Sequence, residues 1–148
     1  MKHLLVTTCL FALSSFAATA TGQKPDFSGT WKLDADRSRF DAIKAPKGFT
    51  MKIVHQDPKM HVLIHERAND EFDVTTDGAE HAVTINGAPA TASALWDDDT
   101  HLLLTVKQNG VTTTRRLHLG DKGKMMTSVL SITDDKGEKK GFGFYTKE

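Results

Sequence analysis

The feature that most constrains the fold is a repeated alternation of apolar and polar residues in short runs. Met60, Val62 and Ile64 occupy every second position of one run, and Met51 and Ile53 do the same in the run before it. A period of two is that of a β-strand with one buried face. No segment is long and periodic like an amphipathic helix. The pattern therefore predicts an all-β domain.

Turn residues separate these runs at short intervals. Asp77-Gly78, Asn86-Gly87 and Asn109-Gly110 are signals for tight β-hairpins. Links this short join antiparallel neighbours. A meander of about ten strands has two exposed edges unless it closes. We therefore expect an antiparallel up-and-down β-barrel of about 8–10 strands, with a two-sheet sandwich as the alternative. Residues 34–48 break the pattern, and a helical turn around residues 34–40 stays open.

The N-terminus has the pattern of a cleaved export signal. Lys2 and His3 precede an apolar run over residues 4–18, shorter than the roughly 20 residues of a membrane-spanning helix. Ala18 and Ala20 satisfy the small-x-small cleavage rule, so we place the cut after Ala20. The sequence predicts a signal peptide over 1–20, a β-barrel domain over 21–148, and a secreted or periplasmic location. A transmembrane anchor is the alternative.

Charge and cysteine content narrow the classes of function. The chain has 19 basic and 19 acidic residues, so its net charge gives no reason to expect nucleic acid or an anionic membrane as partner. The only cysteine, Cys9, falls in the predicted signal peptide, which leaves the mature domain without a thiol. Neither a Gly-x-Ser-x-Gly motif nor a phosphate-binding glycine loop is present. We expect no enzyme and no cofactor, although a scattered His–Asp–Ser site stays open.

Two stretches carry a family resemblance. Residues 27–33, FSGTWKL, and the aromatic end at residues 141–147, GFGFYTK, resemble bacterial lipocalin-like secreted proteins. These belong to the calycin superfamily, with the lipocalins and the fatty-acid-binding proteins. The resemblance implies a barrel whose opening Trp31 closes one end and stacks on an arginine from a late strand, which would be Arg115 or Arg116.

The sequence departs from the fatty-acid-binding proteins at one place. Those proteins hold the ligand carboxylate partly with an arginine two residues before a tyrosine in the last strand. Here Tyr145 is present, but Gly143 stands two residues before it. The familiar clamp is therefore missing from its usual position.

Histidines are the one compositional hint of metal or haem. Predicted strands would place most of them on the solvent face, and His61 and His65 are too far apart along one strand for a single ion. Cross-strand pairing could still bring two together. Asp97-Asp98-Asp99 lacks the spacing of a calcium loop and is expected to be a solvated turn. The six histidines of the mature domain are His55, His61, His65, His81, His101 and His118.

Small side chains point to space inside the barrel. Residues 88–94 contain four alanines, and Gly141 and Gly143 share one face of the last strand. We expect a non-enzymatic protein that holds a small hydrophobic or amphipathic molecule. The alternatives are a packed scaffold that binds another envelope protein, and a haem- or metal-dependent enzyme that uses the histidines. The predicted lining residues are Trp31, Met51, Ile53, Leu102, Leu104, Arg115, Phe142 and Tyr145. Phe142 and Tyr145 would lie on opposite faces of a regular strand, so one of them is misplaced in this set.

Overall fold

The computed structural model describes residues 22–66 and 69–148, so the predicted signal peptide lies outside the described residues. These residues form ten strands and a single 3-10 turn, η1 (Asp121–Gly123). None of the helical residues described could cross a membrane. The strands are β1 (Gly29–Leu33), β2 (Thr50–Gln56), β3 (Lys59–His65), β4 (Asn69–Thr75), β5 (His81–Ile85), β6 (Ala88–Trp96), β7 (His101–Gln108), β8 (Val111–Gly120), β9 (Met125–Asp134) and β10 (Gly137–Lys147).

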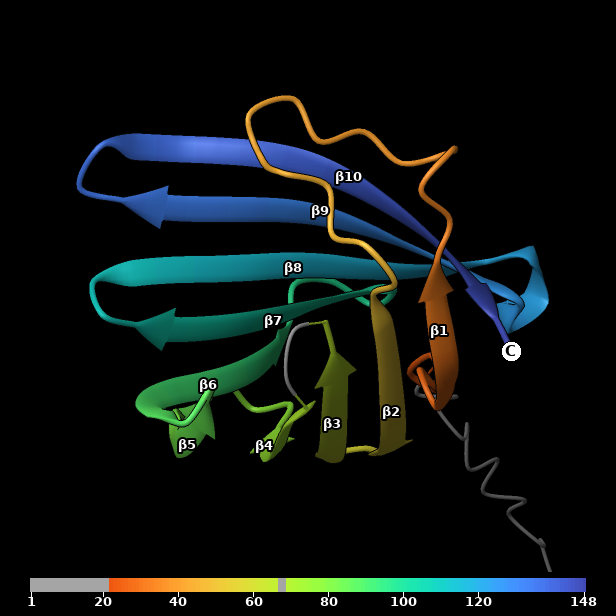
Figure 1. Cartoon of the computed structure of the whole chain (residues 1–148). Coiled ribbons are helices and arrows are strands. Elements are labelled where there is room, and N and C mark those ends of the chain that lie inside the picture. The colour runs from red at the N-terminus through yellow and green to blue at the C-terminus, as the bar shows by residue number, and fades with distance from the viewer. Residues whose placement is uncertain (1–21, 67–68) are drawn as a thin grey trace, which may run out of the picture.

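The strands form one antiparallel sheet that curls into a nearly closed up-and-down barrel (Figure 1). Its order is β4-β3-β2-β1-β10-β9-β8-β7-β6-β5, so the first and last strands meet, and Trp31 pairs with Lys147. This confirms the predicted fold class and rules out the sandwich.

Two of the three predicted hairpins form as expected. Asn86 and Gly87 have φ values of 49° and 75°, and Asn109 and Gly110 have 52° and 75°. A two-residue type I′ turn needs positive φ at both positions, which asparagine and glycine tolerate. These turns connect the paired strands β5–β6 and β7–β8.

The hairpin predicted at Asp77-Gly78 is wrong, because β4 and β5 are not paired with each other. The chain instead extends the pairing of β6 beyond the start of β5. Asp77 forms a bridge with Leu95, and the Gly78 N–H donates to the Ala94 carbonyl at 2.8 Å. A seam therefore runs between β4 and β5.

The link between β1 and β2 contains no helix, so the helical turn left open around residues 34–40 does not form. It runs beside β10 (Figure 1), where Arg39 and Phe142 exchange two backbone hydrogen bonds of 2.6 and 2.8 Å. The reason is length: β1 has 5 residues and β10 has 11, so β10 extends past its partner strand. The link forms hydrogen bonds with backbone groups of β10 that β1 is too short to reach.

Aromatic side chains fill the end of the barrel near the chain's N-terminal strand. Trp31 and Phe27 are fully buried, and the Trp31 Nε1–H donates to the Phe27 carbonyl at 2.9 Å. The Phe27 and His55 rings both lie about 6 Å from the Trp96 ring. This end of the interior is solid.

Candidate ligand cavity

The opposite end of the barrel contains a cavity of 330 Å3. It lies near the β5–β6 and β7–β8 turns and near Glu66 and Asp70. Aliphatic side chains form its walls, and polar groups lie at the floor and rim. The lining residues are Ile64, Glu66, Asp70, Ile85, Asn86, Val106, Gln108, Asn109, Val111, Thr113 and Arg115.

Arg115 is the one cationic group of this cavity. It lies on β8 two residues from the fully buried Leu117, so strand alternation turns both side chains inward. Its guanidinium carbon is 5.6 Å from the centre of the Phe49 ring, a cation–π contact. Among residues 22–66 and 69–148, no carboxylate forms an ion pair with Arg115. Two carboxylates, Glu66 and Asp70, line the same cavity, but neither lies within ion-pair distance of Arg115. A half-buried guanidinium with no ion pair of its own favours an anionic partner.

Tyr145 lies next to this arginine. Its ring meets the Phe49 ring edge-on at 5.9 Å. Burial raises the pKa of the Tyr145 hydroxyl above its ordinary value of 10.0, and the charge of Arg115 opposes that rise. Tyr145 is therefore a neutral donor at physiological pH, directed at the same region as Arg115.

Gly143 makes room for the Tyr145 ring. A Cβ at position 143 would lie 2.8 Å from the Tyr145 hydroxyl oxygen. The missing side chain that breaks the fatty-acid-binding pattern in the sequence is therefore a packing requirement of this barrel.

The rim of the cavity is held by polar side chains that the sequence analysis missed. The Asp70 carboxylate accepts a hydrogen bond from the Asn86 N–H at 2.6 Å, which links β4 to the β5–β6 turn. The Gln108 amide donates to the carbonyls of Ile85 and Ala88 at 2.8 and 3.1 Å. Alternation with Phe72 on β4 and with Val106 on β7 was the signal that could have placed Asp70 and Gln108 inside.

The eight predicted lining residues fall into three groups. Arg115 lines the cavity. The second group is buried in the packed core, and it consists of Trp31, Met51, Ile53, Leu102, Leu104 and Tyr145. These six lie inside the barrel but do not line the cavity. Phe142 lies on the outer face, where it is 38% exposed, because Gly143 and Tyr145 take the inner positions of β10.

The predicted partner of Trp31 is also wrong. The cation above the Trp31 ring is Lys147, with its nitrogen 5.3 Å from the ring centre. Arg115 lies over Phe49 instead, and Arg116 points outward to Asp97 and Asp98. Lys147 takes the place because β10 pairs with β1 and puts this residue directly opposite Trp31.

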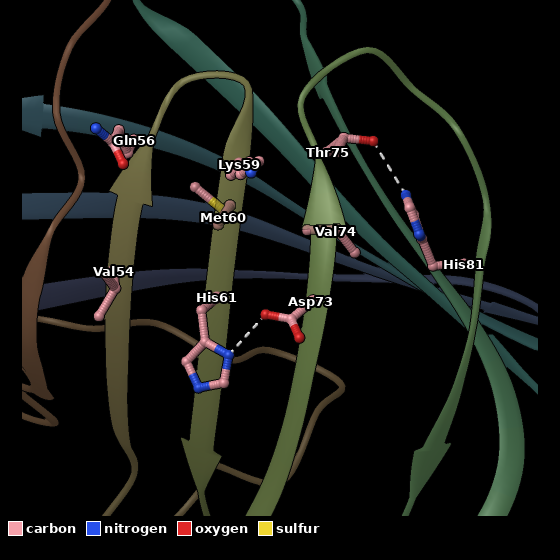
Figure 2. A pocket seen from close by; sticks show the side chains of 9 residues that line it. All are labelled: Val54, Gln56, Lys59, Met60, His61, Asp73, Val74, Thr75 and His81. Atoms are coloured by element: carbon pink, nitrogen blue, oxygen red, sulfur yellow. Dashed lines mark hydrogen bonds and ion pairs between the residues drawn. The ribbon is translucent and has the colours of Figure 1, made fainter.

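A second hollow, of 350 Å3, lies near the β2–β3 turn and the seam (Figure 2). Its polar groups are already paired. His61 contacts Asp73 at 2.8 Å and Glu71 at 2.9 Å, and His81 contacts the Thr75 hydroxyl at 3.0 Å. The hydrogen bond with Asp73 is the main cause that raises the pKa of His61. The two imidazoles of this hollow therefore already have polar partners.

The histidines do not converge inside the barrel. In the described part of the chain, no group of three or more His, Cys, Asp or Glu side chains could hold a metal ion. His55 is buried, and its Nδ1 accepts a hydrogen bond from the Phe27 N–H at 3.3 Å, so it ties the N-terminal segment to β2. The pairing of two histidines across strands is confirmed for His101 and His118, which stack on the outer face.

Comparison with known proteins gives structural relatives only. No protein-family model matches the sequence, and no curated protein matches it significantly. The SAHS protein of Ramazzottius varieornatus has 14% identity and a TM-score of 0.67, over 84% of this chain and 98% of that chain. A Schistosoma mansoni fatty acid binding protein, in complex with arachidonic acid, has 14% identity and a TM-score of 0.60, over 82% and 96%. The fatty acid transporter REP1-NXSQ has 13% identity and a TM-score of 0.61, over 82% and 96%.

At these identities the likeness shows the fold alone. The chain shares the up-and-down barrel fold of these proteins, so the resemblance seen at its two ends is confirmed at the level of fold alone.

Proposed function

We propose that this protein is an exported, non-enzymatic carrier of a small amphipathic molecule with an anionic head group. The head group lies against Arg115 and the apolar tail lies along the cavity walls. The observation that carries this proposal is a half-buried guanidinium that forms no ion pair among the described residues and lines a largely aliphatic cavity.

The chemistry of the cavity favours a carboxylate. A guanidinium binds a carboxylate through two parallel hydrogen bonds. The walls contributed by Ile64, Ile85 and Val106 suit an alkyl chain. Two of the structural relatives are a fatty acid binding protein and a fatty acid transporter, which agrees with this class of ligand.

The size of the cavity favours a short ligand. Its 330 Å3 lies at the lower end of the roughly 300–1,000 Å3 that is usual for small-molecule pockets. The packed core contains Met51, Met60 and Met126, all buried. Methionine side chains repack easily, so a longer chain would enter by displacing them. We therefore assign medium-chain fatty carboxylates as the preferred ligands.

Titration calorimetry with decanoate and decanol tests this proposal. Decanoate should bind more tightly than decanol, because only the carboxylate pairs with Arg115. Arg115→Gln should lower the decanoate affinity by about tenfold, equivalent to roughly 1.4 kcal/mol, and leave the decanol affinity unchanged. Arg116→Gln is the matched control, since it removes the same group one residue away on the outer face and should change neither affinity. Equal binding of decanoate by the wild-type protein and Arg115→Gln would refute the assignment of the head-group site.

Export needs a separate experiment. Expression of the full chain in a Gram-negative host, followed by fractionation and intact-mass measurement, should give a periplasmic product that begins at Thr21. Retention of residues 1–20 on a cytoplasmic product would remove export from the proposal and leave the carrier function standing.

A further inference from the structure

We propose that His101 and His118 form a two-imidazole chelate for a divalent transition metal such as Zn²⁺ on the outer face of β7 and β8. The two residues are direct cross-strand partners. Their rings stack with centroids 4.5 Å apart and an interplanar angle of 23°. This site is separate from the cavity, whose lining comes from the inner face of the same strands.

The backbone brings the two side chains unusually close. The His101 carbonyl accepts from the Asp97 N–H at 2.9 Å, and the His101 N–H donates to the Asp98 carboxylate at 2.8 Å. Both backbone groups of His101 therefore face the β6–β7 turn and not β8. This makes His101 and His118 a non-hydrogen-bonded pair, the type in which side chains approach most closely, with Cα atoms about 4.5 Å apart.

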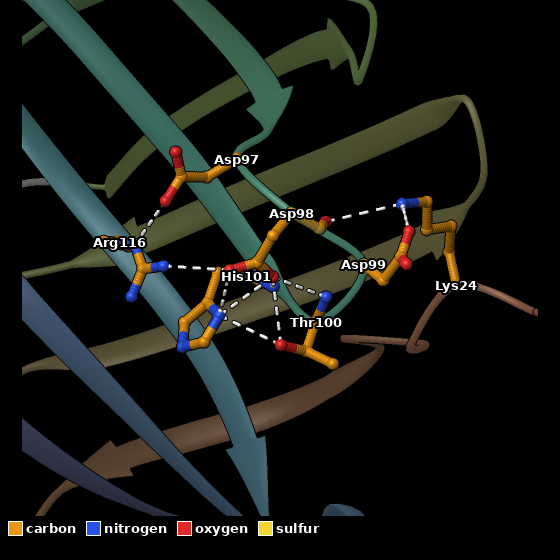
Figure 3. A network of polar contacts seen from close by, with 7 residues as sticks. All are labelled: Lys24, Asp97, Asp98, Asp99, Thr100, His101 and Arg116. Carbon is orange, nitrogen blue, oxygen red and sulfur yellow. Dashed lines mark hydrogen bonds and ion pairs between the residues drawn. The ribbon is translucent and has the colours of Figure 1, made fainter.

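Asp98 fixes the tautomer of the first ring. Its carboxylate oxygens lie 2.8 and 2.9 Å from the His101 Nδ1, as Figure 3 shows. A carboxylate at this position accepts a hydrogen bond from the Nδ1–H, which favours the tautomer whose lone pair is on Nε2. This is the arrangement that orients metal-binding imidazoles in many proteins. Asp98 is itself held in place by the backbone N–H groups of Thr100 and His101, which donate to its carboxylate at 2.7 and 2.8 Å.

The second ring is free to adjust. The His118 Nδ1 is buried and has no hydrogen-bond partner among the described residues. No hydrogen bond therefore opposes the small ring rotation that would turn both Nε2 atoms toward one ion. Zinc needs Zn–N distances of about 2.0–2.1 Å, which two adjacent imidazoles can supply.

The surrounding charges do not repel a dication. The carboxylates of Asp97, Asp98 and Asp99 face the cations of Arg116 and Lys24 (Figure 3), with Arg116 bound to Asp98 at 3.0 Å and Lys24 to Asp99 at 2.9 Å. Three carboxylates face two cations, which leaves one net negative charge beside the two imidazoles. Two imidazoles with water in the remaining positions favour Zn²⁺, Ni²⁺ or Cu²⁺ and form an exchangeable site.

The test is Zn²⁺ binding by the full chain without an affinity tag. Calorimetry should find one ion per chain. His101→Ala and His118→Ala should each lower the affinity at least about tenfold, because loss of an outer partner alone typically costs 10–100-fold. Asp98→Asn should weaken binding less than either. His61→Ala and His65→Ala are the matched controls on β3, away from β7 and β8 in the sheet, and should bind as the wild-type protein does.

A second readout separates ligation from folding. In long-range ¹H–¹⁵N spectra, saturating Zn²⁺ should shift the Nε2 resonances of His101 and His118 and leave those of His61 unchanged. Circular dichroism checks that each variant is folded. The proposal is overturned if the doubly substituted His101→Ala/His118→Ala protein binds Zn²⁺ with wild-type affinity, or if the shifted resonances belong to other histidines.

Discussion

At the scale of single residues, the packing on the inner face of β10 depends on a glycine that has no side chain. Gly143 leaves the space that the Tyr145 ring occupies, and Tyr145 with Phe49 supports Arg115. The ligand-facing arginine therefore depends on a glycine that never contacts a ligand.

Gly143→Ala should destabilise the protein by about 1–3 kcal/mol, the usual cost of overpacking a core. The added Cβ would lie 2.8 Å from atoms of an aromatic ring, which cannot bend away. Urea unfolding measures the change. Gly120→Ala is the matched control, because the nearest atom to its Cβ would be 4.0 Å away and its φ is −122°. Equal stability of both variants would contradict this packing.

His61 should titrate above its ordinary pKa of 6.5, mainly because of its hydrogen bond with Asp73. The pairing stabilises the protonated folded state, so its contribution is complete below the unfolded pKa and disappears as the pH rises through the folded pKa. The side chains are exposed, so the effect on stability is a fraction of a kcal/mol. An NMR titration should show the pKa falling in Asp73→Asn; no change would contradict the pairing.

At the scale of strands, the seam between β4 and β5 is closed by side chains where other strand pairs use backbone. Asp70 binds Asn86 at the cavity end, and Thr75 contacts His81 at the other end. The same seam borders the cavity. Because β4 and β5 share no backbone pairing, we expect the wall to separate here more easily than between paired strands.

Asp70→Ala should therefore loosen this seam. Hydrogen exchange should become faster at Asn86 and along β5, since one of the two side-chain links is lost. Asp134→Ala, which removes a carboxylate from the β9–β10 turn, is the control and should leave β5 unchanged. Protection of β5 equal to that of the wild-type protein would show that Asp70 does not hold the seam.

The strands themselves could be predicted because each one alternates and each true hairpin has its own turn residues. The seam could not be predicted. Asp77-Gly78 has the local pattern of a hairpin, but the Asp77 backbone pairs with Leu95 of β6, a strand that comes later in the chain. The same limit applies to the site. The alternation of period two places Arg115 inside the barrel. Its contact with Phe49 depends on the way in which strands that are not neighbours in the sheet meet across the interior.

At the scale of the whole molecule, the two ends of the barrel differ. Trp31, Phe27 and Trp96 fill one end, and the cavity with Arg115 occupies the other. The Gly-x-Trp opening predicted the filled end. The open end results from small and polar side chains on several strands, which no single motif records.

The central claim is that an anionic amphiphile lies in this cavity. Methyl-labelled protein titrated with decanoate tests it most directly by NMR. The account predicts shifts at the methyl groups of Ile64, Ile85 and Val106, which line the cavity, and none at the outward Val54 and Val129. Shifts confined to Val54 and Val129, or no shifts at saturating decanoate, would contradict it.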